Sequence, residues 1–303
     1  MSCCLLMISA MYENGGNTTH RHLDGHPELH VYPFESQPGT KYIADEFAST
    51  FPYKYRWPVF PLENTVEADF ELMFDEEAKT RIRRPDGSKF RECDLQLKEE
   101  DRTRYFKEFM KDRVRTTGNL VLAYYASTFK AWKNLRASGR ERYYVGYSPI
   151  IGVDSERIFA DLPDAKVIHV VRSPLACLAE TRRRPYPLSI QRYIWTWNLV
   201  QMRALAYQKL YPRRFILVRY EDMLADKRQF MQDLSAQLGI SFDECLLYPS
   251  WNGEKLENQY PWGTIDFPNE DEQKARIAEI PPEDYQYIKT VTQMIANELK
   301  YEI

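Results

Sequence analysis

Hydrophobic residues are concentrated in five short runs that have the pattern of buried β-strands. The runs at 166–171 (KVIHVV) and 215–218 (FILV) are almost uninterrupted, and the others lie at 4–10, 29–32 and 143–147. Apolar strands of this length are typical of parallel sheets that helices cover on both faces. The pattern therefore predicts five strands of one sheet.

Apolar residues recur at helical spacing in the segments between and after these runs. The segments are 18–24, 101–112, 120–135, 154–162, 174–183, 190–210 and 226–238. Gly25 and Pro27 end the first of them, and Gly239 ends the last. Strands that alternate with helices predict an α/β fold, with a central parallel sheet flanked by helices. Because ligands bind at the carboxyl ends of such strands, we expect the turns after residues 10, 171 and 218 to surround a ligand.

Residues 36–140 have a different character, acidic and helical, and we interpret them as an insertion within a single domain spanning 1–303. Within the insertion, residues 51–60 (FPYKYRWPVF) contain five aromatic side chains and two prolines. Because proline interrupts a regular helix, this segment predicts a loop that lines a binding site. We therefore assign the insertion to binding of an acceptor molecule.

The net charge of −3 conceals a strongly cationic block. Residues 166–220 contain eleven basic residues and one acidic residue, Glu180, so the block carries +10 and the remainder −13. A block of this sign predicts an anionic ligand. Nucleic acid is disfavoured because the overall pI is near 6.1 and no nucleic-acid-binding motif is present.

Composition places the chain among globular proteins, with 44% hydrophobic and 28% charged residues. No apolar run approaches the roughly 20 residues that a membrane helix needs. The apolar stretch at 3–10 follows no basic residue and predicts a strand and not a signal peptide. The five cysteines match neither a disulfide framework nor a metal-binding knuckle. We therefore expect a cytoplasmic protein without membrane contact.

The turn after the first strand has the composition of an anion-binding loop. Gly15 and Gly16 precede Asn17, Thr18 and Thr19 at the expected start of a helix. Backbone N–H groups at a helix N-terminus bind phosphate, and glycines let a ligand come close. No lysine occupies the Walker A position, which disfavours an ATP-hydrolysing P-loop. An ordinary turn is the alternative interpretation of the same residues.

The turns after the fourth and fifth strands each carry an arginine at the strand end. Arg172 precedes Ser173 and Pro174, and Arg219 precedes Tyr220. The planar guanidinium group suits phosphate recognition by both charge and geometry. A surface arginine at a sheet edge is the alternative.

Together the three turns resemble those of the sulfotransferases that use 3′-phosphoadenosine 5′-phosphosulfate (PAPS), in particular the bacterial type with a small-molecule or carbohydrate acceptor. The matching stretches are ENGGNTTHRHLDGHPEL with PFE (13–35), YSPIIGVDSERIFADLPDAKVIHVVRSPLACLAETRRR (147–184), FILVRYEDMLADKRQFMQDLSAQLGI (215–240) and, more weakly, NGEKLENQYPWG (252–263). The resemblance covers the two ends of the chain and leaves out 36–140. The resemblance implies a P-loop nucleotide-kinase-like fold. It also implies sulfonate transfer to a hydroxyl or amine of a small molecule, such as a phenol, an alcohol, an amine or a natural-product intermediate.

The resemblance implies that the first turn holds the 5′-phosphosulfate, through Asn14, Gly15, Gly16, Asn17, Thr18 and Thr19. Two alignments of this turn with the family motif are possible, and they differ by one residue. Where the family usually has Lys or Arg, one alignment places Asn14 and the other places Glu13. Where the family usually has Lys-Thr-Pro, this chain has Tyr147-Ser148-Pro149. Both changes remove positive charge near the transferring sulfonate, where electrostatic stabilisation matters most. The candidate replacements are Arg21, Lys41 and the arginines at 182–184.

For the 3′-phosphate, the resemblance implies Arg172, with Thr181 and Arg184 as further ligands. Glu180 stands where the family usually has serine. Tyr220 and Trp197 correspond to residues that contact adenine. A solvated basic face is the alternative for 182–184.

Sulfonate transfer needs a general base and no metal, because an acceptor O–H or N–H attacks sulfur in line and loses its proton. Glu35, in Tyr32-Pro33-Phe34-Glu35, occupies the position of the base in many relatives, and its aromatic neighbours favour a raised pKa. Other relatives use a histidine, for which His20 is the candidate, with His22 and His26 beside it. We prefer Glu35.

Two hypotheses from other classes remain. A PAPS-binding regulatory protein without catalytic activity would explain the missing cations. A metal-dependent hydrolase would use the histidines at 20, 22, 26 and 30, but Pro27 interrupts any helix between the last two and no set of metal ligands is complete. We therefore expect no metal.

Overall fold

A five-stranded sheet with the order β2-β3-β1-β4-β5 forms the centre of the computed structural model, which describes residues 3–133, 137–183, 189–256 and 270–302. All its neighbouring strands are parallel. The strands are β1 (Cys4–Ser9), β2 (Leu29–Val31), β3 (Tyr143–Tyr147), β4 (Lys166–Val171) and β5 (Phe215–Arg219). They are the five strands predicted from the apolar runs. A short antiparallel pair lies apart from them, β6 (Ser250–Trp251) and β7 (Glu254–Lys255).

Helices connect and cover the strands. They are α1 (Gly16–Leu23), α2 (Val66–Leu72), α3 (Glu76–Arg83), α4 (Glu99–Met110), α5 (Thr117–Ala131), α6 (Ser155–Asp161), α7 (Pro174–Arg182), α8 (Ile190–Leu210), α9 (Tyr220–Ala225), α10 (Lys227–Leu238), α11 (Glu270–Ala278) and α12 (Pro282–Glu298). Every predicted helix is present, with ends shifted by four residues at most. The sequence pattern predicted none of α2, α3, α9, α11 and α12. No helix of the described residues combines the length and hydrophobicity that crossing a membrane requires.

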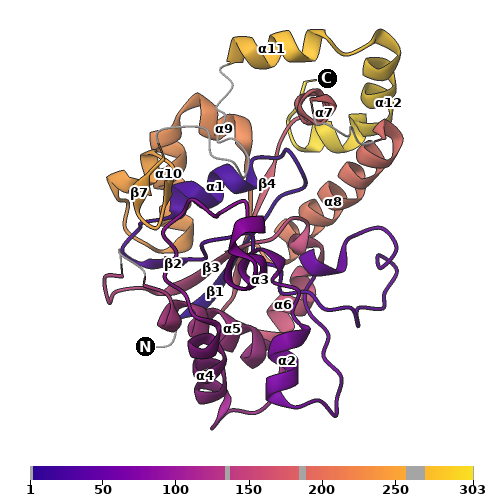
Figure 1. Cartoon of the computed structure of the whole chain (residues 1–303). Helices are drawn as coiled ribbons and strands as arrows, with labels where there is room; N and C mark the ends of the chain where they lie inside the picture. Colours follow the sequence, from indigo (N-terminus) through magenta and orange to yellow (C-terminus); the bar gives the residue numbers. More distant parts are fainter. Residues whose placement is uncertain (1–2, 134–136, 184–188, 257–269, 303) are drawn as a thin grey trace.

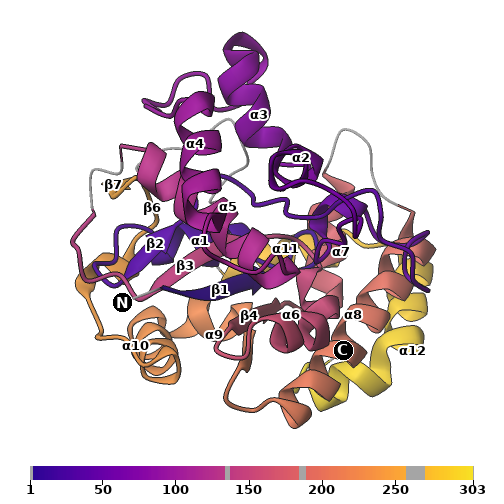
Figure 2. The ribbon, with the colours of Figure 1, turned by 90° about the horizontal axis from the view of Figure 1, so that it is seen from below.

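The two faces of the sheet are buried against different helices. Leu5 and Met7 of β1 pack in a cluster with side chains of α4, α5 and α6, whereas Leu6 and Ile8 pack with those of α1, α9 and α10. Figure 2 shows α4 and α5 above the sheet and α10 below it. The alternation follows from the two-residue period of a strand, and it confirms the predicted α/β architecture.

The segment 36–140 contributes to the main core as well as to the surface. Its last helix, α5, buries Leu120, Val121 and Tyr124 against the sheet, and α4 packs on α5. The earlier part of the segment, with α2 and α3, lies in front of the sheet and beside it (Figure 1).

The aromatic segment 51–60 is irregular, as predicted, apart from one 3-10 turn over Tyr53–Tyr55. Its side chains anchor it to the rest of the molecule. Trp57 is fully buried. The Arg56 guanidinium donates to both carboxylate oxygens of Asp154 at 2.8 Å and to Asp45 at 2.6 Å. A double ion pair of a buried arginine fixes the path of this loop.

A buried polar network joins the start of α3 to the end of β2. Asp75 accepts hydrogen bonds from the hydroxyls of Tyr32 and Tyr124 at 2.8 and 2.6 Å, and from Arg102 Nη2 at 2.9 Å. All four side chains are nearly inaccessible to solvent. Because Tyr32 precedes Pro33-Phe34-Glu35, this network positions the segment that carries the predicted base.

Candidate active site

The turns after β1, β4 and β5 meet at one edge of the sheet, as expected for the carboxyl ends of parallel strands. Asn14 Oδ1 accepts a hydrogen bond from the backbone N–H of Arg172 at 3.0 Å, and its Nδ2 donates to the Tyr12 carbonyl at 2.9 Å. The Tyr220 ring lies against Gly15. The fully buried Asn14 amide is therefore engaged in joining two of the turns.

The two glycines of the first turn are required by neighbouring rings. Gly15 has φ +85°, and a Cβ there would lie 2.2 Å from Tyr220 Cδ2; a Cβ on Gly16 would lie 2.5 Å from Tyr147 Cε2. The sequence suggested that these glycines let a ligand come close. The structure shows a packing role as well, because tyrosine rings lie where a Cβ of either residue would be.

The side chains at the start of α1 divide between the helix itself and a pocket. Thr19 Oγ1 donates to the Gly15 carbonyl at 3.1 Å, and Thr18 is buried. Asn17 is partly exposed and lines the pocket described next. The N-cap, Gly15, has no side chain to cap the first N–H groups of α1, which leaves them available to an anion.

A small pocket of about 60 Å³ brings the first turn and the predicted base together. Asn17, Arg21, Glu35, Glu77 and Lys89 line it, with Pro33, Phe34, Phe90 and Tyr147 as its less polar walls. Two of these residues were predicted site residues, Asn17 and Glu35. Arg21 was a candidate for the missing cation.

Glu35 has the electrostatic character of a base that works near neutral pH. Burial raises its pKa to about 7, and the neighbouring Glu77 carboxylate adds to the increase, while Lys89 and the Tyr55 hydroxyl act against it. The backbone N–H of Glu35 donates to Glu77 Oε2 at 2.9 Å. The expectation of a raised pKa was made from the aromatic neighbours of Glu35, and the structure supports it.

Arg21 is a buried cation that lines the pocket. Its Nη2 donates to the Tyr32 carbonyl at 3.1 Å and to the ring of His20. Its Nη1 is buried and has no hydrogen-bond partner among the described residues. Of the other candidate cations, Lys41 is exposed, Arg182 pairs with Asp284, and Arg183 is exposed. None of these three lines the pocket.

The histidines of the first motif have structural partners. His20 is fully buried, its ring contacts Arg21 Nη2, and burial holds its pKa well below the ordinary value. His22 and His26 bond to the carbonyls of Leu246 and Ser241 at 2.8 and 2.9 Å. The described residues contain no group of three or more His, Cys, Asp or Glu side chains that could hold a metal.

Arg172 lies in the turn after β4 with a guanidinium group that is only partly satisfied. Its side chain is buried, Nη1 donates to the Glu13 carbonyl at 3.2 Å, and its Cζ lies 5.0 Å from the centre of the Tyr220 ring. Nε and Nη2 have no hydrogen-bond partner among the described residues. Unpaired buried donors of this kind favour an anionic ligand.

The remaining predicted nucleotide ligands differ in their surroundings. Trp197 is fully buried and donates to the Arg172 carbonyl at 3.3 Å, so it supports the turn from behind. Thr181 is also buried, and its hydroxyl donates to the Cys177 carbonyl at 2.8 Å within α7. Its neighbour Glu180 is the side chain that faces Arg172. Arg184 lies outside the described residues.

Three residues of the segment 36–140 influence the Glu35 carboxylate, and sequence reasoning named none of them individually. Glu77 lies on α3, Lys89 pairs with it, and the Tyr55 hydroxyl lowers the pKa of Glu35. All three belong to the segment 36–140. The aromatic pattern at 51–60 indicated that this loop lines a site, but no signal in the sequence pointed to Glu77 or Lys89.

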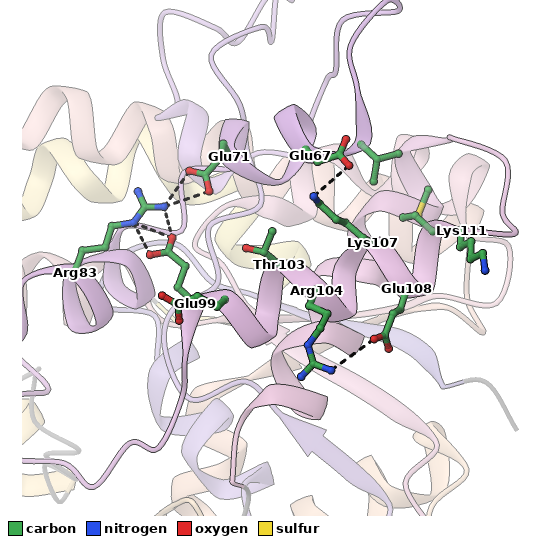
Figure 3. A pocket seen from close by; sticks show the side chains of 12 residues that line it. Glu67, Glu71, Arg83, Glu99, Thr103, Arg104, Lys107, Glu108 and Lys111 are labelled. Carbon is green, nitrogen blue, oxygen red and sulfur yellow. Dashed lines mark hydrogen bonds and ion pairs between the residues drawn. The ribbon is translucent and has the colours of Figure 1, made fainter.

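A wider pocket, about 1140 Å³ against about 60 Å³ for the pocket beside Glu35, lies elsewhere, between α2, α3 and α4 (Figure 3). Figure 3 shows Arg83 between Glu71 and Glu99, and Lys107 facing Glu67, all of them interacting. None of its lining residues belongs to the turns after β1, β4 and β5. We therefore do not assign the reaction to this groove.

The sheet and its clustered turns define an α/β protein of the P-loop-like type, with a ligand-binding edge at the carboxyl ends of the strands. The sequence profile of the sulfotransferase family matches residues 57–244, more than half of the chain. The chain belongs to this family. The match includes most of the segment 36–140, which the motif resemblance left out, and it begins after the first turn.

Two solved structures share the fold. One is the sulfotransferase domain of the olefin synthase of Synechococcus PCC 7002, with 18% identity, a TM-score of 0.52, and coverage of 100% of this chain and 97% of that one. The other is the sulfotransferase domain from the curacin biosynthetic pathway, with 19% identity, a TM-score of 0.51 and 99% coverage of both chains. A comparison with curated protein sequences gave no match.

Proposed function

We propose that the chain transfers a sulfonate group from PAPS to a hydroxyl or amine of a small-molecule acceptor. The observation that carries this proposal is the pocket in which Glu35, with a pKa of about 7, faces the first turn and the buried Arg21. A base and a cation on one side of an anion-binding turn are what an in-line transfer of a charged group requires.

The donor site is supported by the unsatisfied guanidinium groups. PAPS supplies the sulfonate group and carries a 3′-phosphate. Arg172, with two buried nitrogens free of hydrogen-bond partners among the described residues, fits a phosphate. The N–H groups at the start of α1, which no side chain of the described residues caps, fit the 5′ end of the donor. Tyr220, packed between Gly15 and Arg172, offers a ring beside both sites.

Arg21 is our choice for the cation that the first turn lacks. It comes from the same helix as Asn17, it lines the same pocket, and its Nη1 has no hydrogen-bond partner in the described part of the chain. Charge that develops during transfer is best stabilised by a group that is already oriented. The hydrogen bond from Nη2 to the Tyr32 carbonyl provides that orientation.

In this proposal Glu35, and not His20, is the general base that removes the proton from the attacking hydroxyl or amine. Glu35 lines the pocket, whereas the His20 ring is fully buried, contacts Arg21 and has a pKa well below the ordinary value. The segment 36–140 supplies Glu77, Lys89 and Tyr55 beside Glu35, and this supports its role in acceptor binding. The five cysteines all have free thiols, and we place the reaction in a reducing compartment, the cytoplasm.

The test is incubation of the protein with PAPS and a panel of phenols, alcohols and amines, with release of 3′,5′-ADP as the readout. We expect turnover with at least one class of acceptor. Glu35→Gln should abolish turnover and leave the affinity for 3′,5′-ADP unchanged. Arg172→Ala should weaken that affinity by about 2 kcal/mol, as expected when a charged hydrogen-bond partner is lost.

Two outcomes would overturn the proposal in different ways. Tight binding of 3′,5′-ADP without turnover of any acceptor would identify a regulatory nucleotide-binding protein. Full activity of Glu35→Gln would remove Glu35 as the base and return attention to His20.

A further inference from the structure

A second arginine comes close to Arg172 from the C-terminal part of the chain. Arg276 lies on α11, which packs against α7 (Figure 1). Glu180 of α7 lies between the two arginines, with Oε1 2.5 Å from Arg276 Nη1 and 3.8 Å from Arg172 Nη2. A single carboxylate oxygen therefore faces two guanidinium groups.

In this arrangement Arg276 donates a hydrogen bond to Glu180, whereas two nitrogens of Arg172 have no hydrogen-bond acceptor among the described residues. The separation of 3.8 Å between Arg172 and Glu180 is too long for a hydrogen bond. Nε and Nη2 of Arg172 are buried, and neither has a hydrogen-bond partner among the described residues. A buried charged donor without an acceptor is costly, so the site is suited to an anion with more oxygens than Glu180 offers.

We propose that Arg172 and Arg276 form a two-arginine clamp for a phosphate monoester, and that the Glu180 carboxylate occupies this clamp until the phosphate displaces it. The inference rests on the proposed function, in which the phosphate is the 3′-phosphate of the nucleotide. It adds Arg276 as a ligand and gives Glu180 the role of an internal competitor.

The charges at the clamp favour a phosphate that displaces the Glu180 carboxylate over one that binds beside it. A phosphate monoester carries about −1.5 to −2 charges at neutral pH and three acceptor oxygens, which balances two guanidinium groups and can bond to both in bidentate fashion. With Glu180 still in place the site would hold an excess negative charge, and the two anions would repel each other. In the absence of nucleotide, Glu180 holds Arg276 near Arg172, although the two cations repel.

Isothermal titration calorimetry with 3′,5′-ADP and with 5′-AMP tests the clamp, because only the first nucleotide carries a 3′-phosphate. Arg276→Gln should weaken 3′,5′-ADP binding about tenfold, and Glu180→Gln should tighten it about tenfold, as one neighbouring unit charge requires. Neither variant should change the affinity for 5′-AMP.

Each variant has a matched control. Glu272→Gln removes a carboxylate that lies 3.7 Å from Arg276 on the same helix, α11. Arg182→Gln removes an exposed arginine of α7 that pairs with Asp284. Both controls should bind 3′,5′-ADP like the unmodified protein.

The possible failures are distinguishable. If the unmodified protein binds 3′,5′-ADP no better than 5′-AMP, the 3′-phosphate site of the proposed function is wrong. If it prefers 3′,5′-ADP but Arg276→Gln has no effect, or Glu180→Gln weakens binding, only the clamp is overturned.

Discussion

Replacing Glu77 by glutamine should move the acidic limb of the pH–rate profile to lower pH. Glu35 must be deprotonated to act as a base, so kcat/KM should rise with pH through the pKa of Glu35, about 7. Burial is the main cause of that raised value, and the Glu77 carboxylate is the second. Glu77→Gln removes the second cause and leaves the first.

The size of the effect follows from the position of Glu77. Its Oε2 lies 2.9 Å from the backbone nitrogen of Glu35, so the two carboxylates are close neighbours. Two unit charges about 6 Å apart, at an effective dielectric constant of about 20 to 40, interact by about 1.4 to 2.8 kcal/mol. This corresponds to a downward shift of about one to two pH units.

Lys89→Met provides the opposite change, because Lys89 lowers the pKa of Glu35. It should shift the acidic limb upward, and by less, since the Lys89 side chain is 43% exposed and screened by solvent. Glu67→Gln, a change of an exposed carboxylate on α2 that pairs with Lys107, is the matched control and should leave the profile unchanged.

The measurement is kcat/KM from pH 5 to 9 for the four proteins, with PAPS saturating and the best acceptor varied. Shifts of Glu77→Gln and Lys89→Met in the same direction, or an unchanged profile in both, would refute the electrostatic reasoning. Thermal melts of each variant at pH 7 exclude unfolding as the cause of any change.

Three further predictions concern stability. The pKa of Glu35 is about 7 in the folded protein against an ordinary 4.5. The protonated carboxyl therefore contributes fully to the free energy of unfolding below pH 4.5, and this contribution is lost as the pH rises through 7. Glu35→Gln should raise the free energy of unfolding at pH 8 by up to about 3 kcal/mol. Thermal melts at pH 8 and pH 5 check this, and an equal gain at both would contradict it. Gly15→Ala places a Cβ 2.2 Å from a tyrosine ring at φ +85° and should cost about 2 kcal/mol or more in urea unfolding, whereas Gly87→Ala, with open space around it, should be neutral. Asp75→Ala leaves the buried Arg102 without its ion-pair partner at 2.9 Å and should lower the free energy of unfolding by about 3 to 5 kcal/mol; a loss below about 1 kcal/mol would contradict the buried pair.

Much of the fold could be read from the chain because its strands are continuous apolar runs. The boundaries of β3, β4 and α8 agree with the predicted ones to the residue. The position of Arg172 could be predicted because it directly follows a buried strand. A residue at this point of the chain lies at the carboxyl edge of a parallel sheet. The short helices α2 and α3 escaped prediction because few of their residues are buried, which leaves little hydrophobic period to detect.

The sequence by itself determined the five strands, seven of the helices and the three turns, with Arg172 at a strand end, because local patterns carry that information. Glu35 became a candidate through the resemblance to a known family. Only the tertiary structure decided which charges meet. It placed Glu77 and Lys89 beside Glu35, and Arg276 beside Arg172. These partners are 42, 54 and 104 positions apart in the chain, and no local pattern encodes such distances. The chemistry of the site is therefore set by long-range packing, which determines burial and electrostatic neighbours together.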